Sequence, residues 1–353
     1  GAGETPALSA FAGAPLLISL DLLVRAGLLR RRELTPESPA ENGRVDYAAA
    51  HRLKDPPLRL AFERFRRKTT GRGSEIEEYR ARHRGWLEDY ALYRAIGSAR
   101  GNGAWYEWPP PLRRRHRREL DAARRDLADE IDYHVFLQYE FDRQWRQLQD
   151  HCHEAGVRLM GDVPIFVAHE SAEVWAHREV FNLDATGRPR AVAGVPPDYF
   201  SSTGQLWGNP LYRWTALRRR GYDWWLDRLR SVLERFDAVR LDHFIGFVRH
   251  WEVPAGARTA IHGRWVRGPG RDFFQHALET LGDIPIIAED LGTVTPEVTD
   301  LREEFGFPGM RVLQVGFSDD SGTSEHLPHH YPERCVAYTG THDNDTVVGW
   351  YTD

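Results

Sequence analysis

The sequence predicts an α/β fold of the (β/α)8, or TIM, barrel type with an inserted helical subdomain, and two observations carry this prediction. First, the short apolar runs 237–244, 283–288 and 334–339 each end in charged or polar residues, as strands buried on both faces do. Second, their spacing fits barrel units of about 30 residues, with one more strand expected at 310–317. Because the carboxyl ends of barrel strands line one shared mouth, the side chains that follow them should converge.

Three of these strand ends carry carboxylates, namely Asp242, Glu289 and Asp343. Side chains alternate along a strand, so Arg240 should point the same way as Asp242, and its guanidinium should lower the pKa of Asp242. Glu289 follows an apolar run, and apolar surroundings raise the pKa of a carboxyl group. An Arg–Asp pair that only closes a strand is the alternative for Arg240 and Asp242, but the repetition of the pattern favours a functional site.

Four ordered motifs resemble those of the 4-α-glucanotransferases, the amylomaltases of glycoside hydrolase family 77 in the α-amylase clan. They are 240–244 (RLDHF), 288–292 (AEDLG) and 341–344 (THDN), together with the segment 194–210 that contains GVPPDYF and QLWGNP. The resemblance covers nearly the whole chain, and four motifs in order are specific where one would be weak. It implies transfer of α-1,4-glucan segments between maltooligosaccharides or starch-type glucans, with no cofactor.

The same resemblance implies roles for individual residues. Asp242 would be the nucleophile and Glu289 the general acid that later acts as base, because retaining cleavage uses two carboxyl groups about 5 Å apart. Asp343 with His342 would bind hydroxyl groups of the donor sugar. The remaining substrate-binding candidates are Arg240, His243, Tyr199, Phe200, Gln205, Trp207, Asn209 and Asp162. Asp162 precedes the end of its apolar run, which favours an anchoring role there.

The chain divides into three predicted parts. Residues 1–45 form a loop and helix that, by the resemblance, follow the second barrel strand. Residues 46–150 form a mostly helical inserted subdomain, because apolar residues recur there every three or four positions. Residues 151–353 form the catalytic segment, in which the aromatic-rich loop 168–214 is expected to be a lid. By the resemblance its strands are the third to seventh of eight, so we expect a barrel incomplete at both ends and inactive alone.

Composition excludes several classes of protein. The 353 residues carry a net charge of −5, which argues against a general nucleic-acid binder. No apolar run approaches the roughly 18 residues of a membrane helix, so no membrane association is expected. The two cysteines, Cys152 and Cys335, imply no disulfide framework and fit a reducing compartment. We therefore expect a cytoplasmic protein, and a monomer.

Other readings of the same residues stay open. A retaining α-glucan hydrolase would differ only in passing the intermediate to water, and a non-catalytic glucan-binding barrel or a metal-dependent barrel hydrolase would differ in class. The histidine groups 151–153 and 326–330 match no common zinc spacing, so no metal site is predicted. The basic run 113–118 opens a segment of mixed charge, which is typical of a solvated helix.

Overall fold

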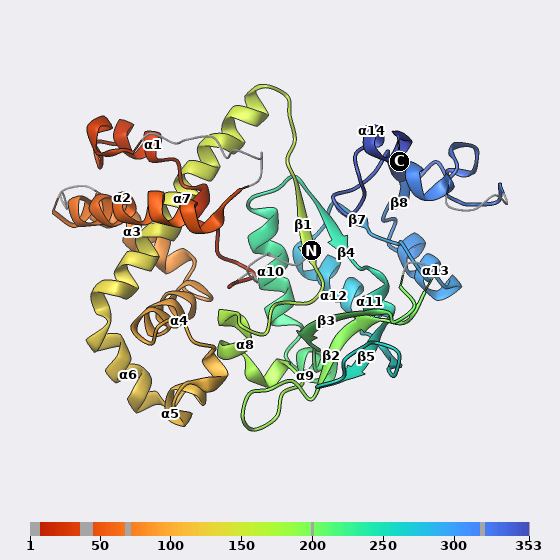
Figure 1. Cartoon of the computed structure of the whole chain (residues 1–353), viewed down its shortest axis with the longest axis horizontal. Coiled ribbons are helices and arrows are strands. Elements are labelled where there is room, and N and C mark those ends of the chain that lie inside the picture. The colour runs from red at the N-terminus through yellow and green to blue at the C-terminus, as the bar shows by residue number, and fades with distance from the viewer. Residues whose placement is uncertain (1–7, 36–44, 68–71, 199–200, 318–321, 353) are drawn as a thin grey trace. The chain divides into compact units, whose positions relative to one another are not determined.

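The computed structural model describes residues 8–35, 45–67, 72–198, 201–317 and 322–352. The chain divides into two compact units, and Figure 1 shows the elements of both. The first unit comprises Gly1–Val157, Ala168–Arg178 and Asp184–Arg188, and the second comprises Arg158–Val167, Glu179–Leu183 and Pro189–Asp353. Residues 1–45 and the helical segment 46–150, predicted as separate parts, both lie in the first unit.

The first unit is built from helices. They are α1 (Leu20–Arg25), α2 (Tyr47–Arg67), α3 (Arg72–Arg82), α4 (Leu87–Ala99), α5 (Pro110–Arg113), α6 (Arg117–Asp126), α7 (Ala128–Glu154) and α8 (Ala172–Ala176). Phe62 and Phe65 are three residues apart and so lie on one face of α2, where their rings lie 5.5 and 5.1 Å from the ring of Phe136 on α7. Such aromatic pairs bury large apolar surfaces and hold the helices together.

Parallel strands form the centre of the second unit. The order of the first sheet is β1 (Met160–Pro164), β4 (Ala238–Asp242) and β7 (Ile286–Ala288), and a parallel pair follows, β8 (Gly309–Val312) with β9 (Cys335–Tyr338). The Ala288 N–H donates to the Pro308 carbonyl at 2.9 Å, which links β7 to the residue before β8. The described residues thus hold five parallel strands in chain order, and the predicted α/β class is confirmed.

Helices supply the crossovers that parallel strands require. Helix α10 (Asp223–Leu233) precedes β4, α12 (Arg271–Leu281) joins β4 to β7, and α13 (Pro296–Glu304) joins β7 to β8. Trp225 of α10 and Phe273 of α12 are fully buried, with ring centroids 5.7 Å apart. The strand side chains Val239 and Leu241 are fully buried as well, so β4 is covered where these residues lie.

A second, antiparallel sheet corrects the expectation that residues 168–214 form an irregular loop. Its order is β3 (Gln205–Pro210), β2 (Ala191–Val195), β5 (Arg249–Pro254) and β6 (Arg264–Arg267), so β2 and β3 lie within the segment that was read as a lid. The short helix α8 lies there too. Strand β2 pairs with β5, which follows β4 in the chain, and such a distant partner leaves no local pattern in the sequence.

The strand expected at 310–317 is also shorter than predicted. Strand β8 ends at Val312, and Leu313–Phe317 forms a 3-10 helix. The Gln314 side chain donates to the Asp345 carbonyl at 3.0 Å, and its backbone N–H donates to the Thr339 carbonyl. These bonds turn the chain out of the strand direction. Phe317 is therefore not at the end of the strand, and its side chain is exposed.

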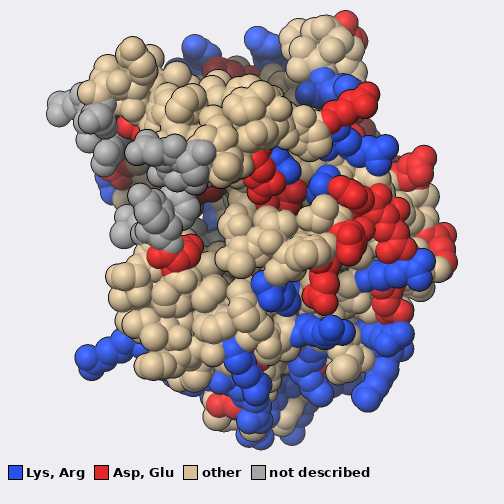
Figure 2. Space-filling model, turned by 90° about the vertical axis from the view of Figure 1, so that its right-hand side faces the viewer, with Lys and Arg blue, Asp and Glu red and all other residues tan. Residues whose placement is uncertain are grey.

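The remaining elements of the second unit are short. Helix α9 (Trp214–Arg219) precedes α10, α11 (Ile245–Val248) separates β4 from β5, and α14 (Val347–Thr352) follows β9. Figure 2 shows one face of the molecule, on which basic side chains gather toward the bottom and acidic ones toward the right. In the part of the chain that the structure describes, no helix is both long and apolar enough to cross a membrane.

Candidate active site at the strand ends

The sheet register brings the predicted carboxylates to one level. Asp242 is the last residue of β4 and pairs with Pro164 of β1, while Leu241 pairs with Ala288 of β7. Glu289 follows Ala288 directly, so it leaves β7 at the height where Asp242 leaves β4. The two carboxylates therefore stand on neighbouring strands at the same edge of the sheet.

Arg240 is the buried cation of this group and is 7% exposed. One guanidinium nitrogen donates to both carboxylate oxygens of Asp162, at 2.8 and 2.7 Å, and another lies 2.7 Å from an Asp242 oxygen. Its Nε donates to the sulfur of Met310 at 3.4 Å. Asp162 thus shares Arg240 with Asp242, an arrangement that suits the anchoring role favoured for Asp162.

The pKa of Asp242 is raised, whereas the sequence predicts that it is lowered. Burial raises the pKa of Asp242, and the neighbouring carboxylates Asp162 and Asp343 add to this, whereas Arg240 opposes it. The expected lowering by Arg240 is present but is outweighed, because desolvation penalises the charged form more than one ion pair favours it. Sequence reasoning counted the cation and missed the burial and the number of carboxylates around it.

Glu289 has the electrostatics expected from its apolar approach. It is 8% exposed, and burial together with the charge of Asp242 raises its pKa to about 7. One of its oxygens accepts the backbone N–H of His243 at 2.6 Å, and the other accepts that of Leu291 at 2.9 Å. These two bonds fix the direction of the carboxyl group, which near neutral pH can both give and take a proton.

His243 connects the two carboxylates and has a strained backbone. Its φ is +52°, in the left-handed region that non-glycine residues seldom occupy and that concentrates at functional sites. Burial lowers the pKa of its imidazole to about 4, so the ring is neutral at neutral pH. Its Nε2 is buried and has no hydrogen-bond partner among the described residues.

Asp343 and His342 lie in the loop after β9, and both side chains are exposed. Within this loop the Thr341 N–H donates to the Asn344 side chain at 2.9 Å, and the Asp343 N–H donates to the Thr341 hydroxyl at 3.2 Å. The charge of Asp343 is one of the causes that raise the pKa of Asp242.

Of the aromatic candidates, Trp207 contacts His243. Its ring centroid is 4.8 Å from that of His243, and the ring is 37% exposed. Gln205 accepts the Trp207 indole N–H at 3.1 Å within β3. The Asn209 amide donates to the Val167 carbonyl at 3.0 Å and so ties β3 to the segment after β1. The predicted contacts Tyr199 and Phe200 lie outside the described residues.

The histidines that were considered as metal ligands have other contacts. His326 is buried, and its Nδ1 accepts the Val312 N–H at 3.2 Å. His330 contacts the Ser324 carbonyl through Nδ1 at 2.8 Å. Across the described ranges, no group of three or more His, Cys, Asp or Glu side chains could hold a metal ion.

Two buried neighbours of the site were missed by sequence reasoning. Asp290 follows Glu289, and Met310 contacts Arg240 from β8. The sequence signal for Asp290 is that it is a second acidic residue directly after a buried strand. Successive side chains there point in different directions, so the Asp290 carboxylate needs a polar partner different from that of Glu289. No local signal marks Met310.

The parallel strands and the carboxylates at their ends define an α/β protein with the kind of paired acids that glycosidic-bond chemistry uses. A family model described as 4-α-glucanotransferase matches residues 6–353, and the chain belongs to this family. The resemblance drawn from the motifs is thereby confirmed.

Individual relatives agree with the family assignment. The chain is 51% identical to a 4-α-glucanotransferase of Thermus thermophilus, over 99% of this chain and 70% of the relative. It is 45% identical to a 4-α-glucanotransferase of Synechocystis, over 100% of this chain and 71% of the relative. A solved amylomaltase of Streptococcus agalactiae, in complex with acarbose, superposes with a TM-score of 0.94 at 38% identity, covering 99% of this chain and 70% of that one.

Proposed function

We propose that this protein transfers α-1,4-glucan segments between maltooligosaccharides or starch-type glucans by a retaining double displacement through Asp242 and Glu289. The observation that carries the residue roles is the pair itself: two carboxyl groups on neighbouring strand ends, one contacting Arg240 and the other buried with a pKa of about 7. Family membership supports the reaction class.

In the first step the Asp242 carboxylate attacks the anomeric carbon of the donor sugar while Glu289 protonates the leaving glycosidic oxygen. The bond to the leaving glucan breaks as the bond to Asp242 forms. Arg240 supports this role because its contact with Asp242 favours the ionised form of that carboxylate. The raised pKa of Glu289 supports the acid role, because a proton must still be present near neutral pH.

In the second step Glu289, now ionised, takes the proton from the 4-hydroxyl of an acceptor sugar, whose oxygen attacks the glucosyl–Asp242 intermediate. Two inversions restore the α configuration. Asp343 and His342 would bind hydroxyl groups of the donor sugar. The exposed ring of Trp207 would stack on the acceptor and favour sugar over water.

Finer features of the protein are part of the same proposal. Five parallel strands in chain order, with helical crossovers, support a (β/α)8-type arrangement of the strands. Cys152 and Cys335 are both free thiols, which supports a reducing cytoplasmic location. We infer that the protein acts as a monomer on soluble glucans and needs no cofactor.

The product pattern from maltotriose tests the proposed function. A transferase should give glucose together with maltopentaose and longer chains, whereas the rival hydrolase should give mainly glucose and maltose. The full-length protein and its Asp242→Asn variant should be run side by side on thin-layer chromatograms. Release of short sugars alone by the unmodified protein would contradict the transferase assignment.

A further inference from the structure

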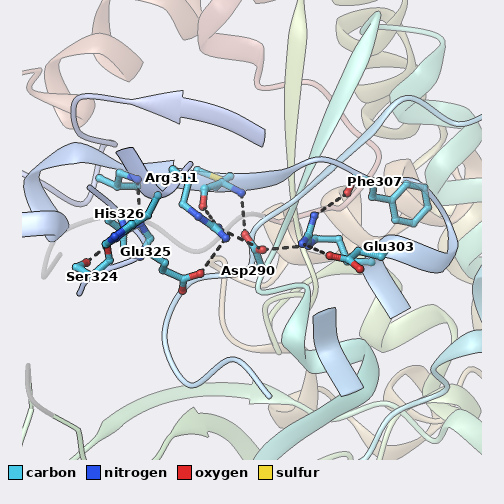
Figure 3. Close-up of polar contacts among 11 residues, drawn as sticks. Asp290, Glu303, Phe307, Arg311, Ser324, Glu325 and His326 are labelled. Atoms are coloured by element: carbon cyan, nitrogen blue, oxygen red, sulfur yellow. Dashed lines mark hydrogen bonds and ion pairs between the residues drawn. The ribbon is translucent and has the colours of Figure 1, made fainter. Parts of the chain in front are cut away.

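A buried charged cluster that the proposed mechanism does not use lies behind Glu289. Asp290, Arg302 and Arg311 are 3%, 5% and 6% exposed, and Figure 3 shows Asp290 between groups that come from α13 and β8. One Asp290 oxygen accepts the Met310 backbone N–H at 2.7 Å. The other lies 3.2 Å from a nitrogen of Arg302 and 3.6 Å from a nitrogen of Arg311. The carboxylate is therefore held from two elements at once.

The backbone around Asp290 is fitted to this carboxylate. A Cβ atom at Gly309 would lie 2.4 Å from an Asp290 oxygen, a distance that real Cβ contacts do not show. Only glycine lets the start of β8 approach so closely. Arg311 also lies 2.8 Å from Glu325, and Arg302 donates to the Phe307 carbonyl, so both cations have partners beyond Asp290 (Figure 3).

Together with neighbouring contacts, these interactions form a closed ring of residues that contains both proposed catalytic carboxylates. Asp290 is bonded to Glu289 in the chain and binds the N–H of Met310. The Met310 sulfur accepts from Arg240, and Arg240 contacts Asp242 at 2.7 Å. Asp242 is bonded to His243, whose N–H returns to Glu289 at 2.6 Å. Asp242 and Glu289 are thus connected in two ways. One connection runs through His243, and the other runs through Asp290, Met310 and Arg240.

Buried charges of this kind cost desolvation energy and add little net stability, so a purely stabilising cluster would be expected to be apolar. Their geometric effect is larger, because one hydrogen bond from β8 and ion pairs with Arg302 of α13 and Arg311 of β8 restrict the position of the Asp290 carboxylate. A displacement of about 1 Å in a reacting group can lower a rate by about 100-fold. The ring therefore bears more directly on the placement of the carboxylates than on folding.

We infer that Asp290 and Met310 are positioning residues, which set the proton donor Glu289 and the nucleophile Asp242 respectively at their working separation. The inference rests on the proposed function. Asp290 acts on Glu289 through the end of β7, and Met310 acts on Asp242 through the Arg240 guanidinium. The two residues therefore have separable effects on the first step of the reaction.

Two donor substrates distinguish the effect of Asp290 from that of Met310. Maltotriose needs a protonated leaving oxygen, whereas α-maltosyl fluoride releases fluoride with little help from an acid, so its single-turnover burst reports the nucleophile alone. Asp290→Asn keeps an oxygen for the Met310 N–H but loses the charge that faces Arg302 and Arg311. Met310→Leu keeps the volume and removes the sulfur acceptor of Arg240. Asp300→Asn and Met160→Leu are matched controls, because both residues are exposed and lie outside the ring.

Asp290→Asn should lower kcat on maltotriose by about 10-fold or more at unchanged KM, while its fluoride burst falls far less. Met310→Leu should lower both rates by the same factor, and the controls should change neither. Equal losses on both donors in Asp290→Asn, or unchanged rates in both ring variants, would overturn the inference. Because Met310→Leu conserves volume, it tests the ring even where Asp290→Asn does not fold. Failure of the unmodified protein to transfer glucan would instead refute the proposed function.

Discussion

The effect of Glu289→Gln on stability should depend on pH. In the folded protein burial raises the pKa of Glu289 from 4.5 to about 7, so the native state binds this proton more tightly than the unfolded chain does. The stability that the proton contributes is complete below pH 4.5 and is lost as the pH rises through 7. Glutamine cannot titrate and so removes this dependence.

The expected magnitude follows from the size of the pKa shift. Between pH 5 and pH 8 the free energy of unfolding of the unmodified protein should fall, relative to that of the variant, by about 2–3 kcal/mol. Glutamine also leaves one of the two N–H donors, His243 or Leu291, facing an amide NH2 group, which costs about 1–3 kcal/mol at either pH. The variant should therefore be the less stable protein at pH 5 and should lose that deficit by pH 8.

Urea unfolding of both proteins at pH 5 and pH 8, followed by tryptophan fluorescence, gives the free energy of unfolding of each protein. The quantity of interest is how the gap between the two proteins changes with pH. Comparing the two proteins at each pH cancels the titration of all other groups that the substitution leaves unchanged. A gap between variant and unmodified protein that stays constant within about 0.5 kcal/mol across this range would refute the assignment of a raised pKa to Glu289.

The remaining predictions concern activity in the full-length protein. Asp242→Asn should abolish transfer from maltotriose, a loss of at least about 10⁴-fold in kcat, and wild-type rates in this variant would rule out Asp242 as nucleophile. The rate of glucan transfer should decline above pH 7 as Glu289 loses its proton, and an acid-to-alkaline profile flat through pH 8 would argue against it as the donor. Trp207→Ala should increase glucose release relative to transfer, as measured by the ratio of free glucose to longer chains, with Trp265→Ala as a control on β6.

The strand ends could be predicted because their signal is local. An apolar run that stops at a carboxylate specifies both the strand and the edge of the sheet where its chemistry lies, and Asp242 and Glu289 were found in this way. The raised pKa of Glu289 was also predictable, since the apolar residues that bury it precede it directly in the chain.

What could not be predicted depends on distant partners. The pairing of β2 with β5 brings together segments separated by β3 and β4, so the region 168–214 looked irregular in the sequence. The pKa of Asp242 depends on Asp162 and Asp343 as well as Arg240, and their combined effect requires distances that no single motif contains. Met310 lies beside Arg240 only because β8 and β7 lie side by side, and its sequence context resembles that of any buried strand.

The most direct test of the account is the identity of the residue that carries the covalent glucosyl intermediate. Glu289→Gln should accumulate this intermediate with α-maltosyl fluoride, because the donor needs little acid catalysis while the second step lacks its base. Peptide mass spectrometry of the quenched, digested protein should then find the added maltosyl mass on the peptide that contains Asp242. An adduct on a peptide that lacks Asp242, or transfer activity that persists in Asp242→Asn, would contradict the proposed mechanism.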